Sequence, residues 1–120
     1  MVDYALLVDK DPETAVSRQK ALMPDGWQEE SGRLNSFAWW CFENKVNLQE
    51  AYELTLKGIR LAANDEDRAS ILDTAAEICN ELGDCQQAVE LIRQAVEAQP
   101  DREYYQKQLE RFEGLLSEKG

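Results

Sequence analysis

Histidine is absent from this chain of 120 residues. Its absence excludes Ser-His-Asp and Cys-His catalytic arrangements and histidine-ligated zinc, and it removes the commonest general base. Long apolar runs are absent too, so no segment approaches the length of about 20 residues that crosses a bilayer. The chain does not open on a signal-peptide pattern. We expect a soluble protein, cytoplasmic as the sequence stands, or periplasmic if the chain is part of an exported protein.

Cysteine is scarce. Cys41, Cys79 and Cys85 form no CxxC pair, and an odd number excludes a complete set of disulfides within one chain. We expect three small buried hydrophobic side chains and neither a metal nor a cofactor. A Cys41–Cys79 disulfide is the alternative, because both residues occupy the same place in two repeats described below, and geometry decides it. A redox function would require an accessible thiolate of low pKa.

Basic side chains are few, 13 against 24 acidic ones, which gives a net charge of −11. Nucleic acids and anionic membranes repel so negative a protein, so we expect neither as a partner. Residues 64–99 are the most acidic stretch, with nine acidic and two basic side chains. Nothing in the sequence places two carboxylates in an apolar pocket, so we expect no enzyme.

Apolar residues recur at spacings of three and four, and no strand pattern is present, which predicts an all-α protein. The clearest helix runs from about Asp67 to Leu82, with Asp65 or Asp67 as its cap and Gly83 in the turn after it. A second helix follows from residue 85 or 86 to residue 98, and Pro100 ends it. Together they predict two antiparallel helices joined by a tight turn.

The same unit occurs upstream, with expected helices over residues 31–44 and 48–63. Ala51 and Gly58 lie 37 residues before Ala88 and Ala95, respectively. In the first helices the spacing is 38, as from Cys41 to Cys79. The chain therefore contains an internal repeat, and a repeat indicates architecture more strongly than any single residue.

The repeated unit resembles the tetratricopeptide repeat. Residues 69–102 carry the family's core, turn and closing-proline positions on Leu72, Ala75, Ala76, Cys79, Gly83, Asp84, Ala88, Ile92, Ala95 and Pro100. Residues 31–68 match less closely: they lack the turn glycine, with Gly58 where alanine is usual and Ala63 where proline is usual. The resemblance implies a short right-handed α-solenoid of antiparallel helix pairs.

The flanks fit the same scheme within one domain over residues 1–120. Residues 103–117 predict a capping helix with its apolar stripe on Tyr105, Leu109, Phe112 and Leu116. Residues 1–30 predict a degenerate helix pair, with a shortened helix over 2–9 and another over 12–22. Trp27 is expected to fasten this segment to the repeats, or alternatively to be a contact residue.

A second resemblance is to the helical extensions that follow thioredoxin-like domains in some bacterial proteins. This resemblance rests on three sequence segments, LNSFAWWCFEN (34–44), ILDTAAEICNELGD (71–84) and YYQKQLERF (104–112). The chain has no CxxC motif and no thioredoxin pattern. The resemblance therefore implies a piece of a longer polypeptide that contributes contacts rather than redox chemistry.

The tetratricopeptide resemblance implies a concave face, lined by the first helix of each unit, that binds an extended peptide or a helix. Matched by register, this face comprises Asn35, Trp39, Phe42, Glu43, Asp73, Glu77, Asn80, Glu81, Lys107 and Arg111. Trp39 and Phe42 are the expected anchors, unless residues 1–30 pack over them. The acidic members suggest a basic peptide, or alternatively a plain solvated surface.

Three function hypotheses follow from these features. The first is an interaction module without catalysis that takes a peptide or helix in its groove. The second is a structural or self-association domain of a larger chain, for which a homodimer is expected. The third is an enzyme or redox accessory that uses the cysteines.

Overall fold

The computed structural model describes residues 12–119, and within them the protein is all-helical, as predicted. The elements are α2 (Pro12–Leu22), the short 3-10 helix η1 (Trp27–Glu29), α3 (Ser31–Asn44), α4 (Leu48–Leu61), α5 (Asp65–Glu81), α6 (Cys85–Ala98) and α7 (Glu103–Lys119). No strand occurs in this part of the chain. The helix predicted over residues 2–9 lies outside the described residues.

The helix boundaries follow the sequence signals to within about two residues, and the predicted cap of α5 needs correction. The cap of α5 is Asn64, whose side chain accepts a hydrogen bond from the backbone N–H of Asp67 at 2.8 Å, so the prediction of Asp65 or Asp67 as the cap was wrong. The helix therefore begins two residues early and places three carboxylates in its first turn, where the helix dipole favours them. Helix α4 ends at Leu61, two residues before the predicted end.

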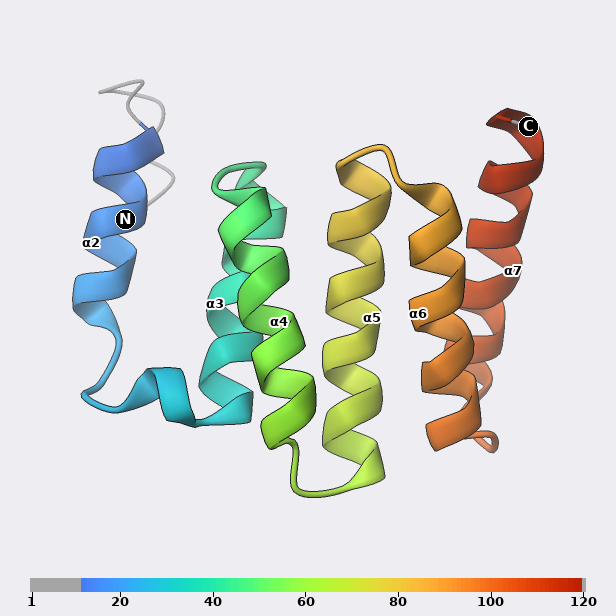
Figure 1. The fold of residues 1–120 in the computed structure, drawn as a ribbon, viewed down its shortest axis with the longest axis horizontal. Helices are drawn as coiled ribbons and strands as arrows, with labels where there is room; N and C mark the ends of the chain where they lie inside the picture. Colours follow the sequence, from blue (N-terminus) through green and yellow to red (C-terminus); the bar gives the residue numbers. More distant parts are fainter. Residues whose placement is uncertain (1–11, 120) are drawn as a thin grey trace.

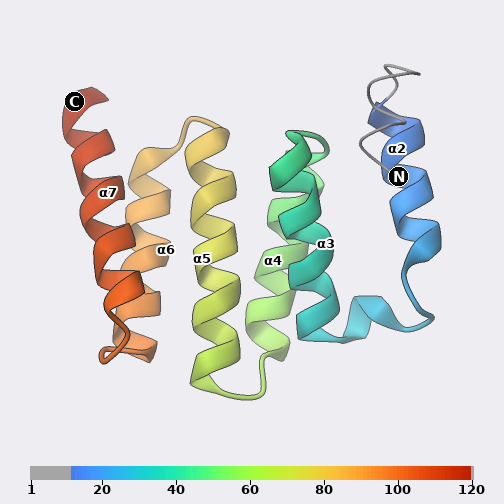
Figure 2. The same cartoon turned by 180° about the vertical axis from the view of Figure 1, so that it is seen from behind.

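Successive helices alternate in direction and stand side by side in a row, with α2 at one end and α7 at the other (Figure 1). Helix α3 packs on α4, α5 on α6, and α4 and α6 each contact the next helix along the chain. Helix α3 also contacts α5. Seen from behind, α3 and α7 lie in front while α4 and α6 lie farther away (Figure 2), so α3 and α7 share one face of the molecule.

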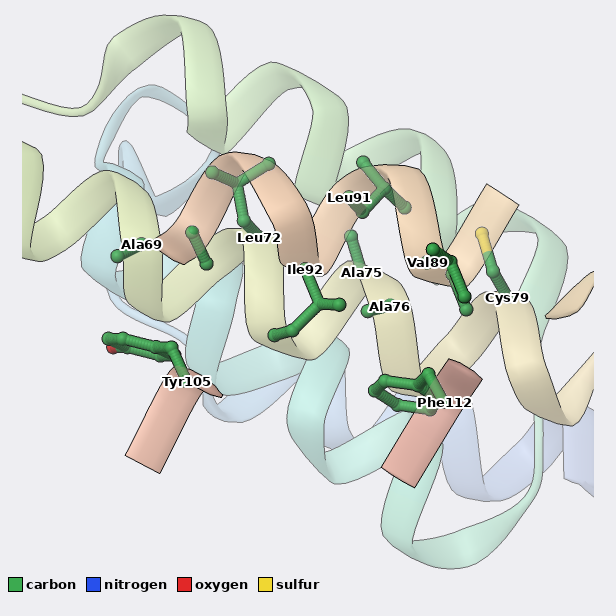
Figure 3. Packing of buried hydrophobic residues seen from close by; sticks show 12 residues of the cluster. Ala69, Leu72, Ala75, Ala76, Cys79, Val89, Leu91, Ile92, Tyr105 and Phe112 are labelled. Carbon is green, nitrogen blue, oxygen red and sulfur yellow. The ribbon is translucent and has the colours of Figure 1, made fainter. Parts of the chain in front are cut away.

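Helix α5 lies at the centre of this arrangement and is buried along most of its length. Its alanines let neighbouring helices approach closely on two sides. Side chains of α5, α6 and α7 meet in one core cluster, with Phe112 of α7 fully buried there (Figure 3).

A second core cluster surrounds α3 and includes Trp27 of η1. The Trp27 ring lies 5.2 Å from that of Phe37, and Val16 and Met23 join the same cluster. Trp27 thus fastens the segment over residues 12–30 to the rest of the protein, as predicted.

Candidate functional site

A hollow of about 340 Å³ lies where α3, α5 and α7 meet. Its described lining consists of Asn35, Ser36, Trp39, Ser70, Asp73, Thr74 and Tyr104. Asn35 and Trp39 stand one helical turn apart on α3 and therefore project from the same side of it. The structure thus brings together three of the residues matched by register: Asn35, Trp39 and Asp73.

Asp73 forms the buried part of this hollow and is 8% exposed. Its Oδ2 accepts a hydrogen bond from the Tyr104 hydroxyl at 2.9 Å, and its Oδ1 accepts one from Nε2 of Gln108 at 2.8 Å. Burial raises the pKa of Asp73, although the hydrogen bonds from Gln108 and Tyr104 oppose the rise. Two neutral donors from α7 therefore hold a desolvated carboxylate in a fixed orientation.

Glu77, one turn further along α5, is occupied by α7. Its Oε2 accepts a hydrogen bond from Gln108 Nε2 at 3.0 Å, and its Oε1 is ion-paired with Arg111. Arg111 also lies 4.5 Å from the centre of the Phe112 ring. Glu77 and Arg111 were both expected on the binding face, and in the structure they bind each other.

Trp39 stands at the rim of the hollow and is 36% exposed. Its ring lies 5.0 Å from that of Phe42, and Nζ of Lys45 sits 3.9 Å above the Phe42 ring. Among residues 12–30, Trp27 makes its ring contact with Phe37 instead. Trp39 is therefore partly open to solvent with residues 12–30 in place, and residues 1–11, which complete the segment expected to cover it, lie outside the described residues.

The other predicted residues lie outside the hollow lining. Glu43 is exposed, and Asn80 accepts a hydrogen bond from the Cys85 thiol at 3.1 Å. Glu81 is ion-paired with Lys45 at 3.3 Å. Lys107 lies 3.5 Å from Glu103 on its own helix, where both side chains are largely exposed.

Four lining residues were missed from the sequence: Ser36, Ser70, Thr74 and Tyr104. The three small hydroxyl residues carry no distinctive spacing. Tyr104 precedes the apolar stripe of α7 by one residue, so its periodicity places it on the outside. Tyr104 reaches the hollow because the first turn of α7 lies against Asp73. This position of α7 relative to α5 is set by tertiary packing and cannot be predicted from the local sequence.

The three cysteines are free and buried. Burial raises the pKa of the Cys41 thiol to about 12 and that of the Cys79 thiol to about 11. The two residues belong to different core clusters, and the Cys41–Cys79 disulfide does not form in this structure. The expectation of small buried hydrophobic side chains is confirmed.

Residues 12–119 contain no cluster of three side chains suited to hold a metal ion. None of the helices described here combines the length and the hydropathy required to cross a bilayer. No protein-family model, curated protein or solved structure matches the chain.

Proposed function

We propose that this chain is a non-catalytic protein-interaction module of the tetratricopeptide type, and that it binds an extended peptide of another protein across α3, α5 and α7. The observation that carries the proposal is the exposed Trp39 at the rim of a polar hollow. A large aromatic side chain left in solvent beside a concavity is typical of a binding anchor.

The helix arrangement supports the repeat assignment. Both helix pairs close their turns in the same way: the N–H of Val46 bonds to the carbonyl of Cys41, and that of Asp84 to the carbonyl of Cys79. The contact between α3 and α5 places the first helices of the two units side by side. A right-handed solenoid with α7 as its cap accounts for these contacts.

The chemistry of the lining suits a peptide backbone. Asn35, Ser36, Ser70 and Thr74 offer hydrogen-bonding groups within one small area. Asn35 donates to the Ser70 hydroxyl at 3.3 Å, whereas its own Oδ1 is buried without a partner. Leaving a buried acceptor unmatched costs free energy, of the order of 1–3 kcal/mol.

Self-association is the second candidate function, because Leu22 at the end of α2 is 72% exposed. At the opposite end of the row, the outer face of α7 is polar, with Gln106, Lys107, Glu110, Glu113 and Ser117 exposed. Obligate dimer interfaces are usually more apolar than this. The exposed polar residues of α7 therefore suit a solvated surface better than a dimer interface, and at this end of the protein they favour peptide binding over self-association.

A selection from a random peptide library tests the proposal. The wild-type protein serves as bait, and the affinity of each selected peptide is then measured for Trp39→Ala and for Leu22→Ala. Leu22→Ala is the matched control, because it also removes an exposed apolar side chain but lies outside the hollow. Circular dichroism first establishes that each variant is folded.

We expect the selected peptides to bind Leu22→Ala as they bind wild type, and to lose at least tenfold in affinity for Trp39→Ala, about 1.4 kcal/mol. Peptides that bind Trp39→Ala as tightly as wild type would overturn the proposal. A concentration-dependent dimer in analytical ultracentrifugation that Leu22→Ala abolishes would favour self-association instead.

A further inference from the structure

We propose that the hollow between α3, α5 and α7 receives one lysine or arginine side chain of the bound peptide, with Asp73 as its counter-charge. The inference rests on the proposed function and adds to it the chemistry of the recognised residue. It also limits recognition to a single basic position rather than a basic stretch.

The charge balance around Asp73 is the first argument. Asp73 and Glu77 contribute two negative charges, and Arg111 is the one cationic side chain that contacts either of them among the described residues. Arg111 is bound to Glu77, so Asp73 is left with hydrogen bonds from neutral groups only. A desolvated negative charge without a cation is costly, and a cation that reaches it is bound favourably.

No described cationic side chain contacts Asp73, and three of the nearby ones are bound to other carboxylates. The described lining residues include no cationic side chain. Lys45 is paired with Glu81, Lys107 with Glu103, and Arg68 with Asp65. A basic side chain of a partner can therefore supply the counter-charge that Asp73 lacks in this structure.

The geometry around Asp73 is the second argument. Each carboxylate oxygen accepts one hydrogen bond within the protein, although an ionised carboxylate has about four acceptor positions. Capacity remains for the N–H groups of an ammonium or guanidinium group. Because Tyr104 and Gln108 already fix the carboxylate, little further ordering is needed when the cation binds.

The aromatic residues of the lining provide the third argument. Trp39 comes from α3 and Tyr104 from α7, so each contributes to the hollow from a different helix. Aromatic faces attract cations and also pack well against the methylene stem of lysine or arginine. The hydroxyls of Ser36, Ser70 and Thr74 add acceptors for the remaining N–H groups.

Recognition of a single basic residue follows from the positions of the other carboxylates. Glu77 is neutralised by Arg111, and Glu81 by Lys45. Neither of them nor Glu43 lines the hollow. A second basic residue of the peptide would meet no unpaired carboxylate within it.

Small-molecule probes test the inference without requiring a known peptide. Wild-type protein labelled with ¹⁵N is titrated with the N-acetyl, N′-methylamide derivatives of arginine, lysine and citrulline, and chemical shifts are followed by NMR. Citrulline is the neutral isostere of arginine and controls for shape. We expect the arginine and lysine probes to shift the Trp39 indole N–H and the backbone amides of Asp73 and Tyr104, and the citrulline probe to leave them unchanged.

Two variants with a matched control assign the charge. Asp73→Asn keeps the shape and an acceptor for Tyr104, and we expect it to weaken binding of the arginine probe at least tenfold. Glu81→Gln removes a carboxylate of the same helix outside the hollow, and we expect it to bind the probe as wild type does. Tyr104→Phe retains the ring but removes the hydrogen bond to Asp73, and we expect an intermediate loss.

Equal shifts with the arginine and citrulline probes would overturn the inference. Undiminished arginine binding by Asp73→Asn would also overturn it. If Asp73→Asn does not fold, two other results would overturn the inference. One is that Tyr104→Phe binds the arginine probe as tightly as wild type does. The other is that the chemical-shift changes in wild type are centred away from the hollow.

The two proposals fail separately. Library peptides that need Trp39 but contain no basic residue would leave the peptide-binding proposal standing and refute the cation site. Arginine binding that depends on Asp73, with no peptide selected from the library, would support the cation site and count against the peptide-binding proposal.

Discussion

Lys45 and Gly83 lie 38 residues apart, and each follows its helix with a backbone hydrogen bond from its N–H to the carbonyl three residues earlier. Each has a positive φ, 55° for Lys45 and 92° for Gly83. The N–H of Lys45 bonds to the Phe42 carbonyl, and that of Gly83 bonds to the Asn80 carbonyl. The left-handed conformation suits glycine but is strained for lysine. The side chain of this strained residue packs its ammonium group over the Phe42 ring and is ion-paired with Glu81.

Replacing Gly83 with alanine should destabilise the protein. A Cβ at this position meets no atom within 4 Å, so the cost comes from the positive φ alone, and we expect a loss of about 1 kcal/mol in unfolding free energy. Gly114→Ala is the matched control, because this glycine is inside α7, also with free space around it. It should stabilise by about 0.5–1 kcal/mol through helix propensity. Urea unfolding of both variants measures the difference, and equal effects of the same sign would contradict the argument.

Gly58→Ala should stabilise the protein even though Gly58 is buried. A Cβ there would lie 3.4 Å from Ile71 Cδ1 and 3.6 Å from Leu34 Cβ, which is ordinary contact. Alanine also favours the helix, so we expect a gain of about 0.5–1 kcal/mol. Gly58→Leu should lose about 1–3 kcal/mol by overpacking. Chemical denaturation of the two variants tests whether this site has room for one methyl group and no more.

Phe112→Ala should greatly weaken the packing of α7 against the core. The Phe112 side chain is fully buried among α5, α6 and α7 (Figure 3). Truncating a buried phenylalanine costs about 3–5 kcal/mol, a large part of the stability of a small domain. Glu110→Ala on the exposed side of α7 should change the unfolding free energy by less than about 0.5 kcal/mol. A thermal melt of Phe112→Ala that matched wild type would show that α7 is not needed for the core.

Asp73 should make a distinctive contribution to the pH dependence of stability. Burial raises its folded-state pKa above the ordinary value of 3.8, so near that pH the folded state binds more protons than the unfolded state. The contribution of Asp73 to stability is therefore greatest below pH 3.8 and falls as the pH rises through the folded-state pKa. Asp73→Asn has no such titration.

The unfolding free energy of wild type relative to Asp73→Asn should therefore decrease as the pH rises from 3.8 through the folded-state pKa of Asp73, and then stay constant up to pH 7. Urea unfolding of the two proteins at matched pH values measures this difference. A relative stability of wild type that increased with pH would show that the carboxylate is stabilised in the folded state, contrary to its burial.

The thiols should be inert in the folded protein. All three cysteines are buried, and burial raises the pKa of Cys41 to about 12 and of Cys79 to about 11, so at pH 8 almost no thiolate is present at either. Titration with Ellman's reagent should detect little reaction in the native state and three thiols in guanidinium chloride. Rapid labelling of the native protein would revive the redox hypothesis.

Local sequence determined the helices and their register. The glycine after Leu82, the Pro100 that ends α6 and the spacing of apolar residues act within one or two helical turns, so they can be interpreted without knowing the fold. The same local signals were ambiguous where several caps compete, and Asn64 rather than Asp65 or Asp67 caps α5. The Cys41 and Cys79 positions were correctly expected to be buried because they lie on the apolar stripe.

Tertiary structure alone decided which surface residues have partners. The tetratricopeptide resemblance predicted that Asp73, Glu77 and Arg111 share one face, but it did not show that Arg111 would bind Glu77 or that Tyr104 would reach Asp73. These contacts depend on where α7 crosses α5, which is set by the packing of both helices in the core. Helical periodicity fixes the direction of a side chain from its own helix, whereas the distance to a neighbouring helix fixes what that side chain meets.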